Sequence, residues 1–227
     1  MSLPHNGYDR RTVLKAVGAA AVGTATAGCL SSADEAGTVL PPPENYDRRQ
    51  DLDLPFPDYG EEIPEITVPA PLQDRDVTTT EFIGERHTMY TFVYTTCTTV
   101  CGALAATLQR VQIDSIESGY ADEMAFLPMT FDPEVDTADV IREYEEGLGV
   151  AEDAGNWYFL RPEDSTEAEQ VVDERFGVAF EGDGGHYQHT SLVLLVNKDG
   201  IVERAYNGDP PRSDIAISDA TTVVEEW

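Results

Sequence analysis

The sequence predicts an α/β domain with a mixed central sheet flanked by helices. Two observations support this fold class: strand-like segments alternate with segments of helical periodicity, and a β-hairpin signal follows them near the C-terminus. The chain has 227 residues and an ordinary hydrophobic fraction of 41%, enough for one core once a targeting segment and a linker are set aside. We therefore expect a single folded domain over residues 60–227.

Each element follows from a local pattern. Residues 87–95 combine aromatic and β-branched side chains, whereas residues 102–118 repeat apolar side chains at helical spacing. Pro128 argues against full pairing of one short apolar run, and Gly177 ends the last predicted helix before the hairpin. Asp199-Gly200 is a strong hairpin signal, because these residues tolerate the positive φ of tight turns. The predicted strands are 87–95, 124–131, 157–160, 191–197 and 201–206, and the predicted helices are 102–118, 136–147 and 165–176.

The charge composition is strongly acidic. The chain has 14 Lys plus Arg against 43 Asp plus Glu, a net charge of −29. Such a surface repels nucleic acid and anionic lipid headgroups, so we expect no nucleic-acid partner. We hypothesise a salt-adapted protein of haloarchaeal type, because the Debye length falls to about 3 Å at 1 M salt and self-repulsion is then screened. The alternative is a solubilising acidic coat, and refolding yield against salt concentration separates the two.

The N-terminus has the layout of an export signal. Arg10-Arg11 precede an apolar run over 16–28 that is too short to span a bilayer. Paired arginines are typical of a twin-arginine signal. Thr26-Ala27-Gly28-Cys29 resembles a lipobox, in which the cysteine becomes the lipidated first residue. We expect residues 1–28 to be removed and Cys29 to anchor the chain on the extracytoplasmic face of the cytoplasmic membrane. A plain cleaved signal is the alternative.

Residues 29–59 are predicted to link that lipid to the domain. They are rich in Pro, Asp and Glu, and Pro41-Pro42-Pro43 favours an extended polyproline conformation. We expect an acidic, proline-rich tether, followed by irregular chain lying against the domain up to Asp76. The domain itself contains no predicted transmembrane helix.

Cys97 and Cys101 are the candidate centre of chemistry. They lie between the first predicted strand and the helix that follows it. A helical four-residue spacing would place both side chains on one face, with Cβ atoms about 5 to 6 Å apart. That geometry suits a shared metal ion or, with local adjustment, a disulfide. A helix N-terminus would favour the thiolate form of Cys101. Two inert core cysteines and a structural disulfide are the alternatives.

A metal ion would need a further ligand. His87, His186 and His189 are the imidazole candidates, since His5 lies in the segment expected to be removed. Thiolate with imidazole suits Cu(I), Cu(II) or Zn. No glycine-rich phosphate loop or haem-attachment motif indicates a nucleotide, flavin or haem.

Four stretches, in the right order, resemble the Sco/SenC family over about residues 60–207. Together they are more specific than a CxxxC motif alone. They are the strand and CxxxC loop at 91–101, the Asp-Pro-x-x-Asp-Thr segment at 131–137, Phe-Gly-Val at 176–178, and the histidine strand from His189 to Asp199-Gly200. Thr98 and Gly102 depart from this pattern, because the family usually has proline after each cysteine. Their effect falls on affinity and redox potential more than on ligand identity, since proline fixes φ and removes an N–H donor.

The resemblance implies a thioredoxin-like fold with a C-terminal β-hairpin and helix. It implies copper, as Cu(I) or Cu(II), bound by Cys97, Cys101 and His189, and delivery of that copper to the dinuclear centre of cytochrome oxidase subunit II or a similar acceptor. The protein would then be a metallochaperone rather than an enzyme. The alternative is a thiol-disulfide oxidoreductase that reduces the cysteines of the oxidase with its own pair.

Other interpretations of single residues are weaker. A peroxidase is disfavoured because Tyr94 stands where peroxiredoxins place a proline, and copper sensing through a partner stays open. His186 is interpreted as a loop residue or an accessory ligand, and His87 as a sheet residue. Asp132 is expected to order the loop near the site through hydrogen bonds.

Overall fold

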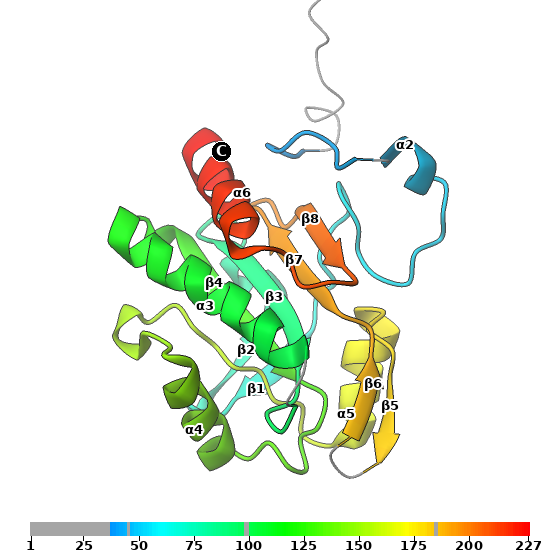
Figure 1. Ribbon diagram of the computed structural model, residues 1–227, viewed down its shortest axis with the longest axis vertical. Coiled ribbons are helices and arrows are strands. Elements are labelled where there is room, and N and C mark those ends of the chain that lie inside the picture. Colours follow the sequence, from blue (N-terminus) through cyan, green and yellow to red (C-terminus); the bar gives the residue numbers. More distant parts are fainter. Residues whose placement is uncertain (1–36, 45, 98–99, 184–185) are drawn as a thin grey trace, which may run out of the picture. The chain divides into compact units, whose positions relative to one another are not determined.

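The computed structural model describes residues 37–44, 46–97, 100–183 and 186–227, with the backbone alone at Val100, Cys101, Asp183 and His186. The predicted signal peptide and Cys29 lie outside these residues. The strands are β1 Thr67–Ala70, β2 Arg75–Thr78, β3 His87–Val93, β4 Met124–Thr130, β5 Phe180–Asp183, β6 His186–His189, β7 Leu192–Val196 and β8 Val202–Asn207 (Figure 1). The α-helices are α2 Tyr46–Arg49, α3 Val100–Ser118, α4 Ala138–Leu148, α5 Ser165–Ala168 and α6 Ser213–Glu226. A π-helical turn over Glu169–Arg175 extends α5, and short 3-10 turns cover Thr79–Phe82, Ala121–Glu123 and Glu152–Ala154.

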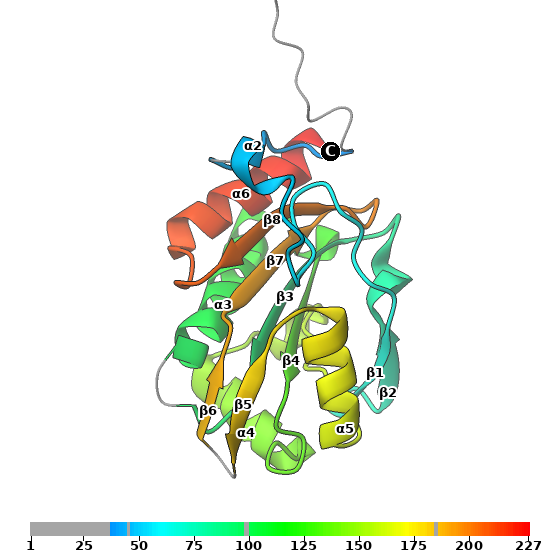
Figure 2. The ribbon, with the colours of Figure 1, turned by 90° about the vertical axis from the view of Figure 1, so that its right-hand side faces the viewer.

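The central sheet is mixed, as predicted, with the strand order β4-β3-β7-β8. Strand β3 pairs in parallel with β4 and antiparallel with β7, which pairs antiparallel with β8. Every residue of β3, β4 and β7 is buried, because helices cover both faces of the sheet. Figure 2 shows α3 and α6 on one face and α5 on the other. No described helix has the length and apolar composition needed to span a bilayer.

Pro128 limits pairing at the outer edge of β4. The segment after Asn156 forms only isolated parallel bridges there, Phe126 with Trp157 and Met129 with Leu160, instead of the predicted strand 157–160. The backbone N–H groups of Phe126 and Thr130 donate to this segment, but proline has no N–H to donate between them. The prediction of strand pairing was therefore wrong over 157–160.

Two β-hairpins, β1–β2 and β5–β6, were not predicted from the sequence. Strands β1 and β2 occupy chain that was expected to be irregular. Strand β1 includes Pro69, whose carbonyl accepts a hydrogen bond from the Arg161 N–H at 2.8 Å. Strands β5 and β6 pair with Asp183 opposite His186. The signal for the second hairpin was Gly184-Gly185, a two-residue turn sequence. His186 therefore begins a strand instead of lying in a loop.

The chain from residue 37 to residue 59 packs against the domain, whereas the sequence predicted a tether with the domain starting at residue 60. Leu40 and Tyr59 are buried in the core, and the Tyr59 hydroxyl donates to the Leu40 carbonyl at 2.7 Å. Fully buried Glu203 of β8 accepts hydrogen bonds from the backbone N–H groups of Val39 and Leu40 at 2.8 and 2.9 Å. Asn197 also donates to Glu203 at 2.7 Å. Apolar burial and this carboxylate hold the segment in place, and we call residues 37–59 the N-terminal arm.

Candidate metal centre

The cysteine loop follows the central strand β3. The Cys97 N–H donates to the carbonyl of Tyr94 at 3.2 Å, and the half-buried Cys97 side chain packs against the core. Cys101 is the second residue of α3, so its backbone lies at the helix end that favours a thiolate. Cys97 precedes the helix, so the four-residue spacing within one helix that was considered for the pair does not apply here. The Cys101 side chain lies outside the described residues.

His189 is the last residue of β6 and lies opposite Phe180 of β5. Its Nδ1 is 3.1 Å from the carbonyl oxygen of Thr190. Because a carbonyl only accepts, this contact assigns the proton to Nδ1 and the lone pair to Nε2, the tautomer that binds a metal through Nε2. Burial lowers the pKa of His189, while the Thr190 contact raises it. The neutral imidazole, which is the ligand form, is therefore favoured.

Aromatic rings bring His189 to the cysteine loop. The ring centroid of His189 lies 5.0 Å from that of Phe131 and 6.3 Å from that of Tyr94, three residues before Cys97. The Tyr94 and Phe131 rings are 5.3 Å apart, and the Tyr187 N–H donates to the Tyr94 hydroxyl at 3.4 Å. The structure thus places Cys97 and His189 at the same end of the sheet. The sequence did not reveal these contacts, because they join three separate strand ends.

The second aspartate of the Asp-Pro-x-x-Asp segment fixes the cysteine loop. Asp136 is fully buried, and its carboxylate accepts hydrogen bonds from the Thr95 backbone N–H at 3.2 Å and from the Thr95 hydroxyl. It also accepts from the hydroxyl of Thr130, the last residue of β4. Burial raises the pKa of Asp136, and the bonds from Thr130 and Thr95 oppose that shift. Asp136 thereby ties the end of β4 to a residue two positions before Cys97.

The sequence predicted that Asp132 orders the loop near the site through hydrogen bonds. Its side chain does hydrogen-bond to Tyr187 of β6, whereas Asp136 is the carboxylate that bonds to the residue before the cysteine loop. Asp132 is buried, but its Oδ2 has no hydrogen-bond partner among the residues that the structure describes. Burial and the charge of Asp136 raise the pKa of Asp132, whereas Tyr187 lowers it. The difference arises from the turn after β4, in which the Asp136 N–H donates to the Asp132 carbonyl at 2.9 Å. This turn brings the second carboxylate, and not the first, between the two strand ends.

The other two histidines are separated by the fold. His87 begins β3, at the end of the strand opposite the cysteine loop, and is buried as the sheet residue that the sequence predicted. His186 begins β6, three residues before His189, and its side chain lies outside the described part of the chain. Beside His189 is an open groove of about 500 Å³ along the β5–β6 hairpin, lined by Phe180, Gln188 and Thr190 among others.

The donor set fits copper by its chemistry. Two thiolates and a neutral imidazole match the ligand preference of Cu(I) and Cu(II). Among the described side chains, no three potential ligands form a cluster. The Cys101 side chain is not one of the described side chains, so this finding does not test the proposed ligand set. The observation that carries the fit is the His189 tautomer held beside the loop of Cys97 by Tyr94.

A mixed sheet whose central strand leads into a CxxxC loop and a helix defines a thioredoxin-like dithiol protein, and the histidine at the same sheet end adds a third metal-binding group. The family model described as SCO1/SenC matches residues 72–225, more than half of the chain. The chain therefore belongs to the SCO1/SenC family, and the predicted fold class and family resemblance are confirmed.

Solved structures show the same fold at low sequence identity. A SCO1/SenC family lipoprotein from Bacillus anthracis is 18% identical with a TM-score of 0.61, over 74% of this chain and 96% of that chain. BsSco, described as a member of the Sco family of cytochrome c oxidase assembly proteins with a disulfide switch, is 23% identical with a TM-score of 0.60, over 73% and 94%. ScoI from Arabidopsis thaliana, solved with copper bound, is 16% identical with a TM-score of 0.59, over 72% and 98%. Among curated proteins, none matches this chain.

Proposed function

We propose that this protein carries one copper ion for the assembly of the dinuclear copper centre of a haem-copper oxidase. Cys97, Cys101 and His189 would hold the ion as cargo. The observation that carries the proposal is the position of His189, whose ring is held beside the cysteine loop by Tyr94 and Phe131. Membership of the SCO1/SenC family and the copper bound in the Arabidopsis thaliana relative support it.

Such a carrier needs no covalent catalysis, because the copper ion only coordinates to the protein and leaves it again. Both thiols lose a proton when copper binds, so affinity falls as the pH is lowered. The position of Cys101 at the start of α3 favours its thiolate, and the burial of His189 favours the neutral ring. Thiolates of the acceptor then take the ion by ligand exchange. The groove beside His189 leaves room for the acceptor to approach.

Copper stoichiometry and affinity test this proposal. We expect the reduced protein lacking residues 1–29, in high salt, to bind one copper ion, and His189→Ala and Cys97→Ser each to bind it far more weakly. His186→Ala, on the same strand, tests the accessory ligand: unchanged affinity would leave Cys97, Cys101 and His189 as the set, and weakened binding would add His186 to it. Copper binding that persists in His189→Ala would exclude this ligand set.

A thiol-disulfide oxidoreductase that reduces the oxidase cysteines is the second candidate. The disulfide switch described for BsSco favours it, because that protein shares this fold. Thiol exchange with an oxidised peptide that carries the two acceptor cysteines separates the candidates. A reductase keeps its exchange rate in His189→Ala and loses it in Cys97→Ser, whereas a carrier loses its copper affinity in both variants.

We also propose that a lipid on Cys29 anchors the protein outside the cytoplasmic membrane. The described chain begins at the end of the sheet that lies opposite the metal centre. The Gly37 carbonyl accepts a hydrogen bond from Asn197 at 2.9 Å, beyond the end of β7. That end of the sheet is where β3 begins, and Cys97 follows the other end, about 20 Å away for seven residues of strand. Figure 1 shows the start of the N-terminal arm, residues 37–44, at the end of the domain opposite the β5–β6 hairpin. The related Bacillus anthracis protein is described as a lipoprotein.

Membrane fractionation tests the anchor. We expect the full chain to sediment with membranes and Cys29→Ala to appear in the soluble extracytoplasmic fraction. Equal sedimentation of both proteins would contradict lipidation without bearing on copper binding.

A further inference from the structure

A cavity of about 310 Å³ lies between α4, the turn that joins β1 to β2, and the segment before Tyr158. None of its lining residues belongs to the candidate metal centre. Three walls are apolar, formed by Leu72, Val150 and the indole of Trp157. The carboxyl group of Glu145, from α4, is the buried polar group that lines it.

Glu145 is only partly satisfied by its surroundings. Its side chain belongs to a residue that is 2% exposed, and its Oε1 accepts a hydrogen bond from Trp157 Nε1 at 3.0 Å. Within the described chain, no donor reaches Oε2. Oε2 is not enclosed by protein atoms, and the Glu145 carboxyl lines the cavity, so a molecule in the cavity can reach this acceptor. The cavity beside it therefore has a place for a hydrogen-bond donor.

Charges around Glu145 favour a cationic donor. Burial is the main cause that raises the pKa of Glu145 to about 7; the Trp157 bond and Arg142, which also lines the cavity, oppose the rise, and the charge of Glu152 adds to it. Arg142 also pairs with the exposed Asp139 at 2.7 Å. The carboxyl therefore holds its proton to a higher pH than an ordinary glutamate, and a bound cation would favour its ionised form.

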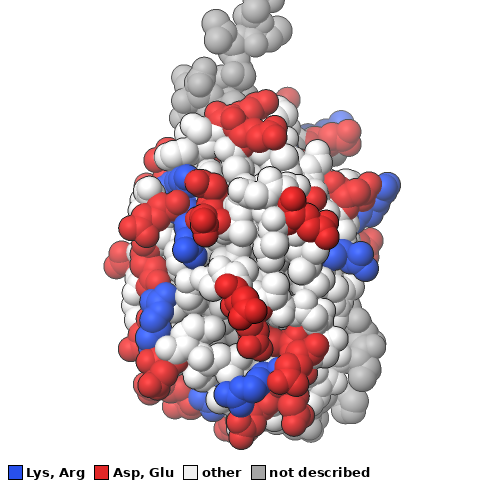
Figure 3. Space-filling view, turned by 90° about the vertical axis from the view of Figure 1, so that its left-hand side faces the viewer, with Lys and Arg blue, Asp and Glu red and all other residues white. Residues whose placement is uncertain are grey.

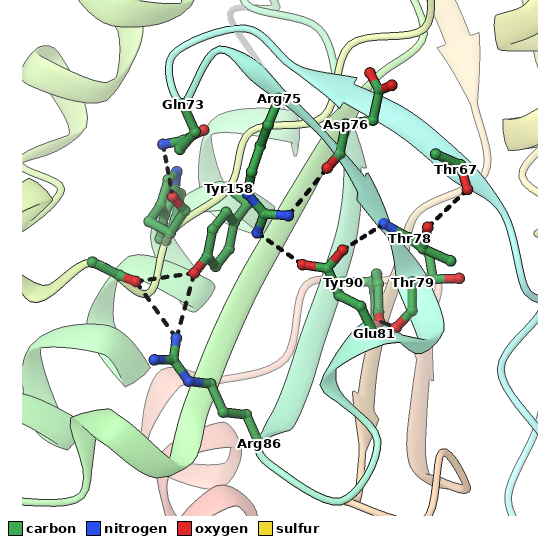
Figure 4. A network of polar contacts seen from close by, with 12 residues as sticks. Thr67, Gln73, Arg75, Asp76, Thr78, Thr79, Glu81, Arg86, Tyr90 and Tyr158 are labelled. Atoms are coloured by element: carbon green, nitrogen blue, oxygen red, sulfur yellow. Dashed lines mark hydrogen bonds and ion pairs between the residues drawn. The ribbon is translucent and has the colours of Figure 1, made fainter.

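The rim of the cavity is already arranged by other contacts. Figure 4 shows Arg75 and Arg86 meeting at Tyr158. Arg75 lies 5.1 Å from the centre of the Tyr158 ring and pairs with Glu81 at 2.7 Å. Gln73 Nε2 donates to the Trp157 carbonyl at 3.1 Å. These bonds hold two aromatic walls in position without using the Glu145 carboxyl.

We propose that this cavity binds a primary alkylammonium group. The ammonium donates to Oε2 of Glu145, and the alkyl stem packs against Trp157, Leu72 and Val150. A charge-assisted bond to a shielded carboxylate is stronger than a neutral one. A small free amine and the lysine side chain of a partner protein share this chemistry.

Tryptophan fluorescence and calorimetry test the site in the full chain. The sequence has two tryptophans, so Trp227→Phe leaves Trp157 as the only reporter. We expect saturable binding of n-butylammonium and none of n-butanol. Amine binding should release part of a proton at some pH between 5 and 8, measured in buffers of different ionisation enthalpy. Glu145→Gln should weaken binding at least about tenfold, while Glu146→Gln, on the exposed side of the same helix, should not.

Equal amine affinity in Glu145→Gln, or amine binding that releases no proton at any pH between 5 and 8, would overturn the proposal. The proton measurement uses unaltered Glu145, so it remains decisive if that variant does not fold. Nα-acetyl-lysine-N-methylamide separates the two sources. Binding of both probes supports a partner lysine, binding of butylammonium alone supports a small amine, and binding of neither overturns the site.

Discussion

At the scale of single residues, Asp136 is the side chain that most directly shapes the metal centre without being one of the proposed ligands. It joins Thr95, before the cysteine loop, to Thr130 at the end of the neighbouring strand. We expect Asp136→Ala to lower the free energy of unfolding by about 2 to 4 kcal/mol, because several buried donors lose their acceptor. Denaturant unfolding measures this loss.

The same variant should release copper faster, because Thr95 no longer fixes the start of the loop that carries Cys97. Asp139→Ala is the control, since its exposed pair with Arg142 contributes less than about 1 kcal/mol. Equal copper release from the two variants would show that Asp136 supports the fold and not the loop.

His87 provides a residue-scale prediction on pH. It is buried, its Nδ1 has no hydrogen-bond partner among the described residues, and its ring meets that of Trp227 at 5.6 Å between centroids. Burial, followed by the charge of Lys198, lowers its pKa from 6.5 to about 4, against the opposing charge of Glu123. Between these values the unfolded chain binds the proton and the folded chain does not. Stability is therefore lost as the pH falls from 6.5 to 4, by up to about 3 kcal/mol.

Urea unfolding of the parent protein and of His87→Phe at pH 6.5, 5 and 4 measures this effect. Carboxylates titrate in both proteins, so the comparison isolates the histidine. We expect the variant to lose up to about 3 kcal/mol less than the parent over this range. Parallel stability curves would mean that His87 is protonated in the folded protein.

At the scale of elements, the N-terminal arm packs directly against Gly177, which follows the α5 region. The φ of Gly177 is +65°, and a Cβ built there would lie 1.8 Å from the carbonyl oxygen of Pro55. Gly155 has a φ of +61° but no atom within 4 Å of such a Cβ. Alanine substitutions at these two glycines can therefore be compared: both strain the backbone, but only the one at Gly177 also collides with the arm.

We expect Gly155→Ala to cost about 1 kcal/mol, the ordinary penalty of a left-handed conformation. Gly177→Ala should cost at least about 2 kcal/mol more, since the arm must move away from the helix. Thermal unfolding measures both, and trypsin cleavage after Arg48 or Arg49 should accelerate only in Gly177→Ala. Equal losses in the two variants would mean that the arm does not rest on this glycine.

Periodicity predicted the elements that form the central sheet, because a buried strand and an amphipathic helix each leave a local pattern. The arm could not be predicted in this way. Leu40 reaches its acceptor Glu203 across 163 positions of sequence, and Pro41 to Pro43 indicated an extended tether. The ligand candidates were evident from residue types and family motifs. Their alignment by Tyr94 and by Asp136 was not, since it depends on which strand ends meet.

At the scale of the whole molecule, acidic side chains dominate the surface. Figure 3 shows Asp and Glu scattered over one face of the molecule, with fewer Lys and Arg between them. The excess of 43 acidic over 14 basic residues gives the net charge of −29. Ion pairs such as Arg49 with Asp58 at 2.6 Å neutralise only a minority of these carboxylates. The folded state therefore holds this negative charge at a higher density than the unfolded chain does.

Dissolved salt should stabilise the folded protein by screening this negative charge. Screening should raise the unfolding temperature of the reduced, copper-free protein between 0.1 and 1 M KCl, and the rise should flatten once the Debye length falls to about 3 Å. A steady further rise up to 3 M would indicate preferential exclusion of salt from the surface instead, as a sulfate series would confirm. An unfolding temperature that does not depend on KCl would contradict salt adaptation, because the acidic coat would then serve solubility alone.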